Sequence, residues 1–437
     1  MSVQGVKNLP NMSELWRKLG WTFAILLLYR VGIHIPIPGT DAVAMNEFFQ
    51  NMSNTLFGVF DMFSGGGLSN FSIFALGVMP YISASIILQL VQVLSPNLKR
   101  IAREEGAQGR KKITQYTRYL TVLITIVQGY GLAVMVEGQQ SPNGTPLISP
   151  EIQGPLFEFV TVVTLSAGTI LIMWLGEQIT ARGIGNGISL IIFSGIVAGI
   201  PRAIGMSYQQ LSEGVLNPLV ALVVVIFMVC VMLVVVFVER AQRRLPIHYA
   251  KRQHGRKIYG GQTTHLPLRL NTAGVIPPIF AGSLLAFPAT LANFSHNEII
   301  KQIHVFFNMD SLLYNVVYAL LIIFFCYFYT AIIFDPKDIA DNLKKQGGFV
   351  PGIRPGDKTQ EYIDTVLTRI TLWGATYITI ICLVPQFLKV QFNLPFFFGG
   401  TSILIVVGVA MDFMNQVNSY MISRQYEGLM AKGRRGR

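Results

Sequence analysis

Ten apolar segments, separated by mostly polar connections, constrain this chain more than any other feature. A helix needs about 20 apolar residues to cross a bilayer. Windows of roughly that length fit ten ranges, of which the fifth is short and rich in glycine: 20–36, 71–94, 116–136, 155–175, 187–202, 217–238, 274–293, 312–334, 366–385 and 399–419. Since 51% of the residues are hydrophobic and only 13% are charged, the sequence predicts an all-α integral membrane protein with ten transmembrane helices.

Lysine and arginine are concentrated in every second connection. The stretches 33–70 and 136–156 contain neither residue, whereas 99–118, 239–273 and the C-terminal tail are strongly basic. Because basic loops tend to stay on the cytoplasmic side of a membrane, we expect these loops and both termini in the cytoplasm. Much of the net charge of +12 is therefore a topology signal and does not indicate nucleic-acid binding.

A shorter apolar stretch precedes the second long segment. Residues 57–63 are too few to span a bilayer. They are followed by Ser64 and by Gly65, Gly66 and Gly67, and glycine breaks helices because it adopts positive φ angles freely. Irregular backbone at membrane depth must be covered by protein or line a cavity. We therefore expect a half-helix that faces an internal cavity; a re-entrant turn at the surface is the alternative.

A short motif occurs twice in the chain. The pattern Gly-Val-x-Pro-x-Ile begins at Gly77 in the second segment and at Gly274 in the seventh. If the chain divides into five plus five segments, the two motifs occupy equivalent segments that run in opposite directions, as in inverted repeats. Proline inside a helix removes a hydrogen bond and bends the helix, so the motif predicts two bent helices at a central interface. Chance repetition and static packing kinks are the alternatives.

The apolar segments contain few ionisable side chains. Arg30 lies near the outer end of the first segment, Glu158 and Glu177 bracket the fourth, and Asp412 lies in the last. Ion-coupled transporters usually bury such groups along their pathway, so the sequence favours a passive pore; a secondary transporter with broken helices is the alternative. Cysteine and histidine spacings match no metal site and no catalytic arrangement is recognisable, so we expect neither a cofactor nor enzymatic activity.

Isoleucines recur near the middle of different segments, at Ile82, Ile188, Ile192, Ile279 and Ile405. Ile188 and Ile192 are four residues apart and share one helix face. Narrow apolar constrictions can close a pore because water leaves them. Isoleucine in a membrane helix more often faces lipid or packs against a neighbour, so this pattern alone favours the ordinary interpretation.

Two of the basic connections, 239–273 and 335–364, are longer than a simple turn requires. In the second, Arg354 lies between Pro351 and Pro355. Each proline restricts the backbone, so the arginine is expected at the tip of a stiff turn, where its guanidinium suits an anionic or carboxylate partner. An ordinary surface turn is the alternative.

Several long strings carry a resemblance to a known family: MFSGGGLSNFSIFALGVMPYISASII, MWLGEQITARGIGNGISLIIFSGIVAGIP, THLPLRLNTAGVIPPIF, ADNLKKQGGFVPGIRPG and PFFFGGTSILIVV. Over residues 19–427 the chain resembles the SecY/Sec61-alpha family, the channel-forming subunits of Sec protein translocases. The resemblance implies two inverted five-helix halves, 1–205 and 206–437, which form a clamshell around an hourglass pore. It also implies that a half-helix at about residues 55–67 plugs this pore.

The same resemblance implies roles for individual residues. The pore ring is expected at Val78, Ile82, Ile188, Ile192, Ile279 and Ile405. The plug is expected to include Phe57, Phe60, Met62, Phe63, Gly65, Gly66 and Gly67. The lateral gate is expected to include Ser83, Gln89, Gln128 and Phe287, with Asn186 in the pore wall. The surface that docks a motor protein or a ribosome is expected to include Arg256, Lys257 and Arg354.

The resemblance further implies a function in the bacterial cytoplasmic (inner) membrane. The channel is expected to pass unfolded secretory proteins across the phospholipid membrane and to release transmembrane segments sideways into it. Its expected partners are the membrane subunits SecE and SecG, the ATPase SecA, the translating ribosome, and clients that carry signal peptides.

Overall fold

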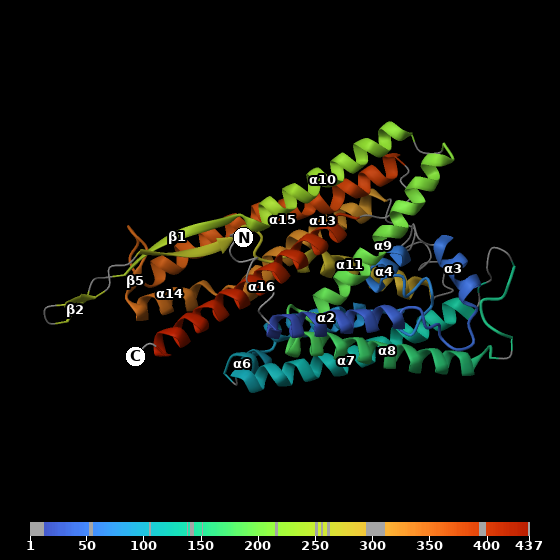
Figure 1. Cartoon of the computed structure of the whole chain (residues 1–437), viewed down its shortest axis with the longest axis horizontal. Helices are drawn as coiled ribbons and strands as arrows, with labels where there is room; N and C mark the ends of the chain where they lie inside the picture. The colour runs from blue at the N-terminus through green and yellow to red at the C-terminus, as the bar shows by residue number, and fades with distance from the viewer. Residues whose placement is uncertain are drawn as a thin grey trace.

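The structure, a computed structural model, describes residues 13–51, 56–104, 106–137, 139, 144–150, 152–214, 217–249, 252–254, 257–259, 263–293, 311–392 and 399–435. Each apolar segment contains a helix (Figure 1): α2 (Ser13–Gly32), α5 (Met79–Leu94), α7 (Gly106–Glu137), α8 (Pro155–Arg182), α9 (Gly187–Ser212), α10 (Pro218–Arg240), α11 (Ile276–Asn293), α13 (Leu312–Ile333), α15 (Asp357–Phe392) and α16 (Gly400–Arg435). Within the described residues, seven helices are long and apolar enough to cross a membrane, and α5 and α11 are shorter apolar helices. The tenth helix, α2, belongs to neither group, but a helix occupies part of each of the ten predicted segments.

The second membrane helix begins later than its hydropathy indicates. α5 starts at Met79, whereas the apolar segment starts at residue 71. Residues 65–78 form successive turns, and the Ile37 N–H donates to the carbonyl of Phe71 in this stretch at 3.0 Å. Neighbouring chain therefore satisfies part of this irregular backbone, as its depth in a membrane requires.

The repeated Gly-Val-x-Pro-x-Ile motif starts a helix at both of its positions. Gly77 and Gly274 both have left-handed backbones, with φ of +54° and +65°. α5 begins two residues after the first glycine, at Met79, and α11 begins two residues after the second, at Ile276. The motif prolines therefore lie in first helical turns, where a main-chain N–H is not needed. The prediction that they bend these helices from within is wrong, although the shared conformation supports the inverted-repeat hypothesis.

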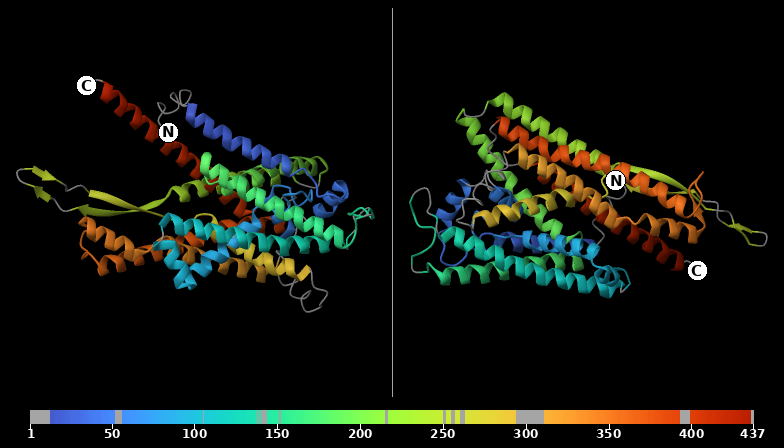
Figure 2. Two further views of the ribbon diagram at one scale, coloured as in Figure 1. Left: turned by 90° about the horizontal axis from the view of Figure 1, so that it is seen from below. Right: turned by 180° about the vertical axis from the view of Figure 1, so that it is seen from behind.

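Smaller elements gather at the two ends of the helix bundle (Figures 1 and 2). The helices α6 (Pro96–Glu104) and α14 (Pro336–Gln346) lie at one end, together with the C-terminal part of α16. The helix α3 (Ala42–Asn51) and residues 144–150 lie at the opposite end. The basic connections are thus grouped at one end and the connections without Lys or Arg at the other.

A small antiparallel sheet, which the sequence analysis did not predict, joins the two long basic connections. Its strands in spatial order are β4 (Thr263–Arg269), β1 (Gln242–Tyr249) and β5 (Gly348–Phe349), and β2 (Arg252–His254) pairs with β3 (Lys257–Tyr259) further out. Arg243 pairs with Leu268, and His248 pairs with Phe349. Leu245, Ile247 and Leu268 bury their side chains against residues of α14 and α15. The apolar segments contain helices, as predicted, but the described part of the loop 239–273 contains β-strands.

Candidate functional site

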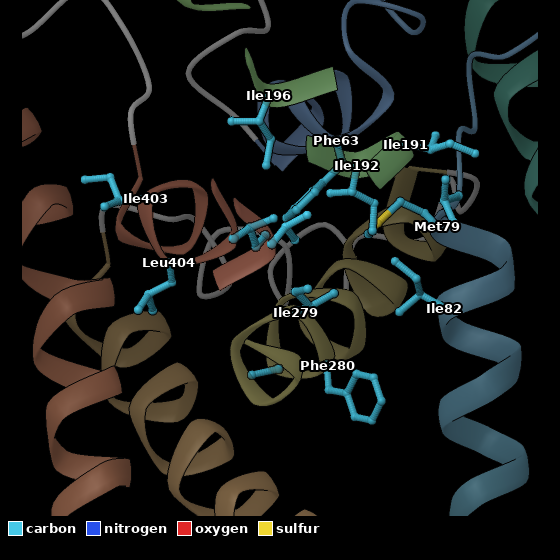
Figure 3. Packing of buried hydrophobic residues seen from close by; sticks show 14 of the residues in the cluster. Phe63, Met79, Ile82, Ile191, Ile192, Ile196, Ile279, Phe280, Ile403 and Leu404 are labelled. Atoms are coloured by element: carbon cyan, nitrogen blue, oxygen red, sulfur yellow. The ribbon is translucent and has the colours of Figure 1, made fainter. Parts of the chain in front are cut away.

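The expected ring residues lie in a single buried apolar cluster, although they come from four helices. Val78 and Ile82 lie at the start of α5, Ile188 and Ile192 in α9, Ile279 in α11 and Ile405 in α16. All are buried except Ile188, which is half-buried and packs against the cluster. Figure 3 shows Ile82, Ile192 and Ile279 on three different helices within the cluster that also contains Phe63. We call this cluster of ring residues the waist.

Local structure explains how the helices present these side chains. Ile82 and Ile279 each fall in the first turn after a left-handed motif glycine, so both helices start at the waist. Asn186 precedes α9, and its side-chain oxygen accepts from the Ile188 N–H at 3.2 Å. This is an N-cap, which stabilises the helix start. Asn186 is exposed and acts on the waist by fixing the start of α9.

The expected plug contains the helix α4 (Leu56–Ser64), which packs against α9. Phe63 is buried in the apolar cluster that contains the waist, and Phe60 and Met62 are half-buried against the same cluster. The side chain of Phe57 lies outside the described residues. Met62 Sδ also accepts a hydrogen bond from Ser402 Oγ of α16 at 2.9 Å. The plug helix therefore touches helices from both proposed halves of the chain.

Glycines make the turn after α4 compact. Gly65 and Gly66 have φ of +71° and +90°. A Cβ atom on Gly65 would lie 2.7 Å from the Cα of Gly195 in α9. A larger residue at Gly65 or at Gly195 would therefore force the two segments to move. Gly67 is also tightly packed, because its Cβ would lie 2.9 Å from the carbonyl oxygen of Phe74.

Asp61 organises the same turn from within the plug. Its carboxylate accepts from the Ser69 N–H at 2.7 Å, and its main-chain carbonyl accepts from the Gly66 N–H at 2.9 Å. Burial raises the pKa of the Asp61 carboxyl, whereas the bonds from Ser69 and the charge of Arg202 oppose this shift. The helix and its turn thus form a single hydrogen-bonded unit.

Two side chains of α2, neither of them among the expected plug residues, contact this turn. Tyr29 Oη donates to the Ser64 carbonyl at 2.8 Å, and Arg30 Nη1 donates to the Gly65 carbonyl at 2.8 Å. The sequence signal for Arg30 was a charge inside an apolar segment. Tyr29 carried no comparable signal, because a tyrosine in a membrane helix is common.

The expected gate residues are distributed over helices that meet at one seam, since α11 packs against α5 and α7. Gln89 Nε2 donates to Ser85 Oγ of its own helix at 3.2 Å. The Oε1 atoms of Gln89 and Gln128 are buried and have no hydrogen-bond partner among the described residues. Neither oxygen therefore forms a hydrogen bond across the seam to a described residue. Ser83 is half-buried, and the side chain of Phe287 lies outside the described residues.

Arg354 lies in the turn between β5 and α15 and is exposed. Its carbonyl accepts from Thr359 Oγ1 at 3.0 Å, and Gly352 and Gly356 take left-handed conformations on either side of it. This turn is locally fixed, as expected. Arg256 and the side chain of Lys257 lie outside the described residues.

The ring side chains carry no reactive groups. They are aliphatic, and a narrow aliphatic constriction excludes water and ions. Among the described residues, no group of three or more His, Cys, Asp or Glu side chains could hold a metal ion. An arrangement of this kind can open and close a path, and its state depends on the plug and on the helices that carry the ring.

Comparison with known proteins identifies the family. The family model described as SecY matches residues 72–414. The "Protein translocase subunit SecY" of Escherichia coli (strain K12) is 51% identical over 426 residues, which cover 97% of this chain and 95% of that protein. The protein of the same name from Aquifex aeolicus (strain VF5) is 44% identical over 427 residues, covering 98% of this chain and 99% of that protein.

Solved structures share the fold at lower sequence identity. A structure described as a protein conducting channel has a TM-score of 0.65 at 19% identity, covering 93% of this chain and 92% of the other. A structure concerning the plug domain of the SecY protein has a TM-score of 0.64 at 20% identity, with the same coverage. Sec61 in a canine ribosome-channel complex gives 0.62 at 19% identity, again with that coverage. By its sequence relatives and by its fold, this chain belongs to the SecY family.

Proposed function

We propose that this chain is the central protein-conducting channel of a Sec translocon, and that the waist is its closed constriction. The observation that carries the proposal is that aliphatic side chains from α5, α9, α11 and α16 belong to one buried apolar cluster, and that the plug helix packs against α9 and α5. An unfolded polypeptide passes through the waist once the plug has moved. The aliphatic ring then fits around the chain and limits ion flow.

The channel opens between two halves, 1–205 and 206–437. The seam where α11 meets α5 and α7 is the lateral gate, through which apolar client segments leave for the lipid. This assignment is supported by the inverted motif, which starts α5 and α11 in the same way, and by the polar side chains of Gln89 and Gln128 in helices at that seam. Client binding opens the gate if it is stronger in the open state than in the closed state.

Cytoplasmic partners dock on the sheet and on the turn that carries Arg354. Pairing of β1 with β5 brings the two long basic connections side by side, so one partner can contact both. By the family resemblance these partners are the SecA motor and the translating ribosome, while SecE and SecG accompany the channel in the membrane. The canine Sec61 structure, which is a ribosome-channel complex, supports the ribosome. The protein resides in the bacterial cytoplasmic membrane with both termini in the cytoplasm.

We infer that the chain itself catalyses no reaction, and that the energy for transport comes from its partners. The alternative of an ion-coupled solute transporter is not retained. The half-buried Asp61 carboxylate serves the turn after the plug helix, and membership of the SecY family supplies a different function.

The proposal is tested with the purified channel complex in proteoliposomes. With SecA and ATP, a secretory client should become protected from added protease inside the vesicles, and without ATP it should remain digestible. Two results together would contradict the proposed function. The client would stay digestible even with SecA and ATP, and vesicles without any client would take up small solutes.

A further inference from the structure

The C-terminal end of the plug helix is held by a neighbouring helix. The last carbonyls of any helix lack intrahelical partners. In α4, the Met62 carbonyl accepts from the Gly65 N–H at 3.2 Å, which is a bond within the plug. The carbonyls of Ser64, the last residue of α4, and of Gly65, which follows it, accept from Tyr29 Oη and Arg30 Nη1 of α2, both at 2.8 Å. Consecutive residues of α2 thus bind consecutive carbonyls of the plug.

The surroundings of both donors favour these hydrogen bonds. Tyr29 is fully buried, and its ring stacks on Phe74 with centroids 5.7 Å apart and an interplanar angle of 21°. Arg30 is half-buried, and a positive charge near the C-terminal end of a helix is favoured by the helix dipole. A charge within a membrane segment is costly without a partner, so loss of the Gly65 carbonyl would leave Arg30 in a poorer environment. Both features favour the seated plug.

We propose that Tyr29 and Arg30 form a latch that holds the plug closed and thereby sets how strong a signal sequence must be to open the channel. This inference rests on the proposed function. The latch binds main-chain atoms, so it depends on the position of the plug backbone and not on the plug side chains. Opening breaks both hydrogen bonds, whereas client recognition at the seam of α5 and α11 does not involve either residue directly.

The two bonds differ in expected strength. A buried neutral hydrogen bond of ordinary strength corresponds to about a fivefold change in an equilibrium, and a bond from a charged group to roughly tenfold or more. Tyr29→Phe removes only the hydroxyl and keeps the stacked ring, so it should raise the plug-displaced fraction about fivefold. Arg30→Met removes the charge and should have the larger effect.

The test uses the complete channel complex in proteoliposomes with its motor and two clients, one with an intact and one with a weakened signal sequence. We expect Tyr29→Phe to raise transport of the weakened client severalfold and to leave the intact client unchanged. Tyr208→Phe is the matched control, because Tyr208 is an exposed tyrosine of α9 remote from the plug turn. Unchanged selectivity in both Tyr29→Phe and Arg30→Met would overturn the latch.

Hydrogen exchange gives a second readout that is independent of transport. In Tyr29→Phe the peptide covering residues 56–72 should exchange faster, while α2 itself keeps its protection. Faster exchange in α2 alone would mean that the hydroxyl supports only its own helix, and would also overturn the proposal. If the wild-type complex transports neither client, the proposed function fails, whereas equal selectivity in an active complex rejects only the latch.

Discussion

Replacing Gln89 by leucine should make the channel harder to open. In the closed structure the Oε1 atom of Gln89 is buried without a partner among the described residues, while its Nε2 atom bonds to Ser85 in the same helix. The intrahelical bond can persist when the seam opens, so it does not distinguish the two states. Under the proposed gating, the buried oxygen does distinguish them, because opening the seam would let water or a client reach it.

The size of the effect follows from this one atom. A buried polar group left unsatisfied costs about 1–3 kcal/mol. Leucine removes that cost from the closed state and adds apolar packing at the seam. The closed state should therefore gain at least about 1 kcal/mol, which corresponds to roughly a fivefold shift in the closed–open equilibrium.

The assay is export of a client with a weakened signal sequence, measured at equal channel levels. Export should fall severalfold in Gln89→Leu, and a client with an intact signal should be affected less. Gln210→Leu is the matched control, because Gln210 also buries an unpaired Oε1 atom but lies near the far end of α9. Improved export in Gln89→Leu would refute the argument from the unpaired oxygen, and an equal loss in Gln210→Leu would show a nonspecific effect.

Three further predictions concern the waist, the plug and the docking surface. At the waist, three isoleucines are changed together to glycine: Ile82, Ile192 and Ile279. This triple change should let ions leak through the resting channel in planar bilayers. Gly195→Val should displace the plug and raise the resting conductance, because a Cβ at this position would already lie 3.1 Å from the Phe63 carbonyl oxygen. Gly199→Val on the same helix is the control and should not raise the conductance, because a Cβ there would meet nothing within 4 Å. Arg354→Glu should abolish motor-driven transport while membrane insertion and assembly persist; normal transport with the purified motor would reject this docking site.

The arrangement of the helices was predictable because it depends on long-range averages. Apolar length identifies ten segments, and the distribution of Lys and Arg orders the loops, so errors at single residues do not matter. Helix starts were less predictable. The motif prolines looked internal because the apolar run extends upstream of Met79, and only the left-handed conformation of Gly77 shows that the helix starts at the motif.

The sheet was missed because its apolar signal is short. In β1 only Leu245 and Ile247 are buried, and they are surrounded by basic and polar residues, which are typical of a loop.

Part of the candidate site was predictable from the sequence and part was not. The family resemblance indicated the ring residues, and the structure places them in one cluster. The bonds of Tyr29 and Arg30 to plug carbonyls were not predictable, because a main-chain acceptor leaves no mark in the side-chain sequence.

The path of the client through the waist can be measured directly. A photoreactive amino acid is placed at Ile192, which lies in the waist, or at Leu233, which is 65% exposed on α10. A client is then arrested halfway through the reconstituted channel and the complex is illuminated. We predict strong crosslinks from position 192 to the client and none from position 233. Efficient transport with no crosslink from position 192 would contradict the claim that the waist is the protein-conducting constriction.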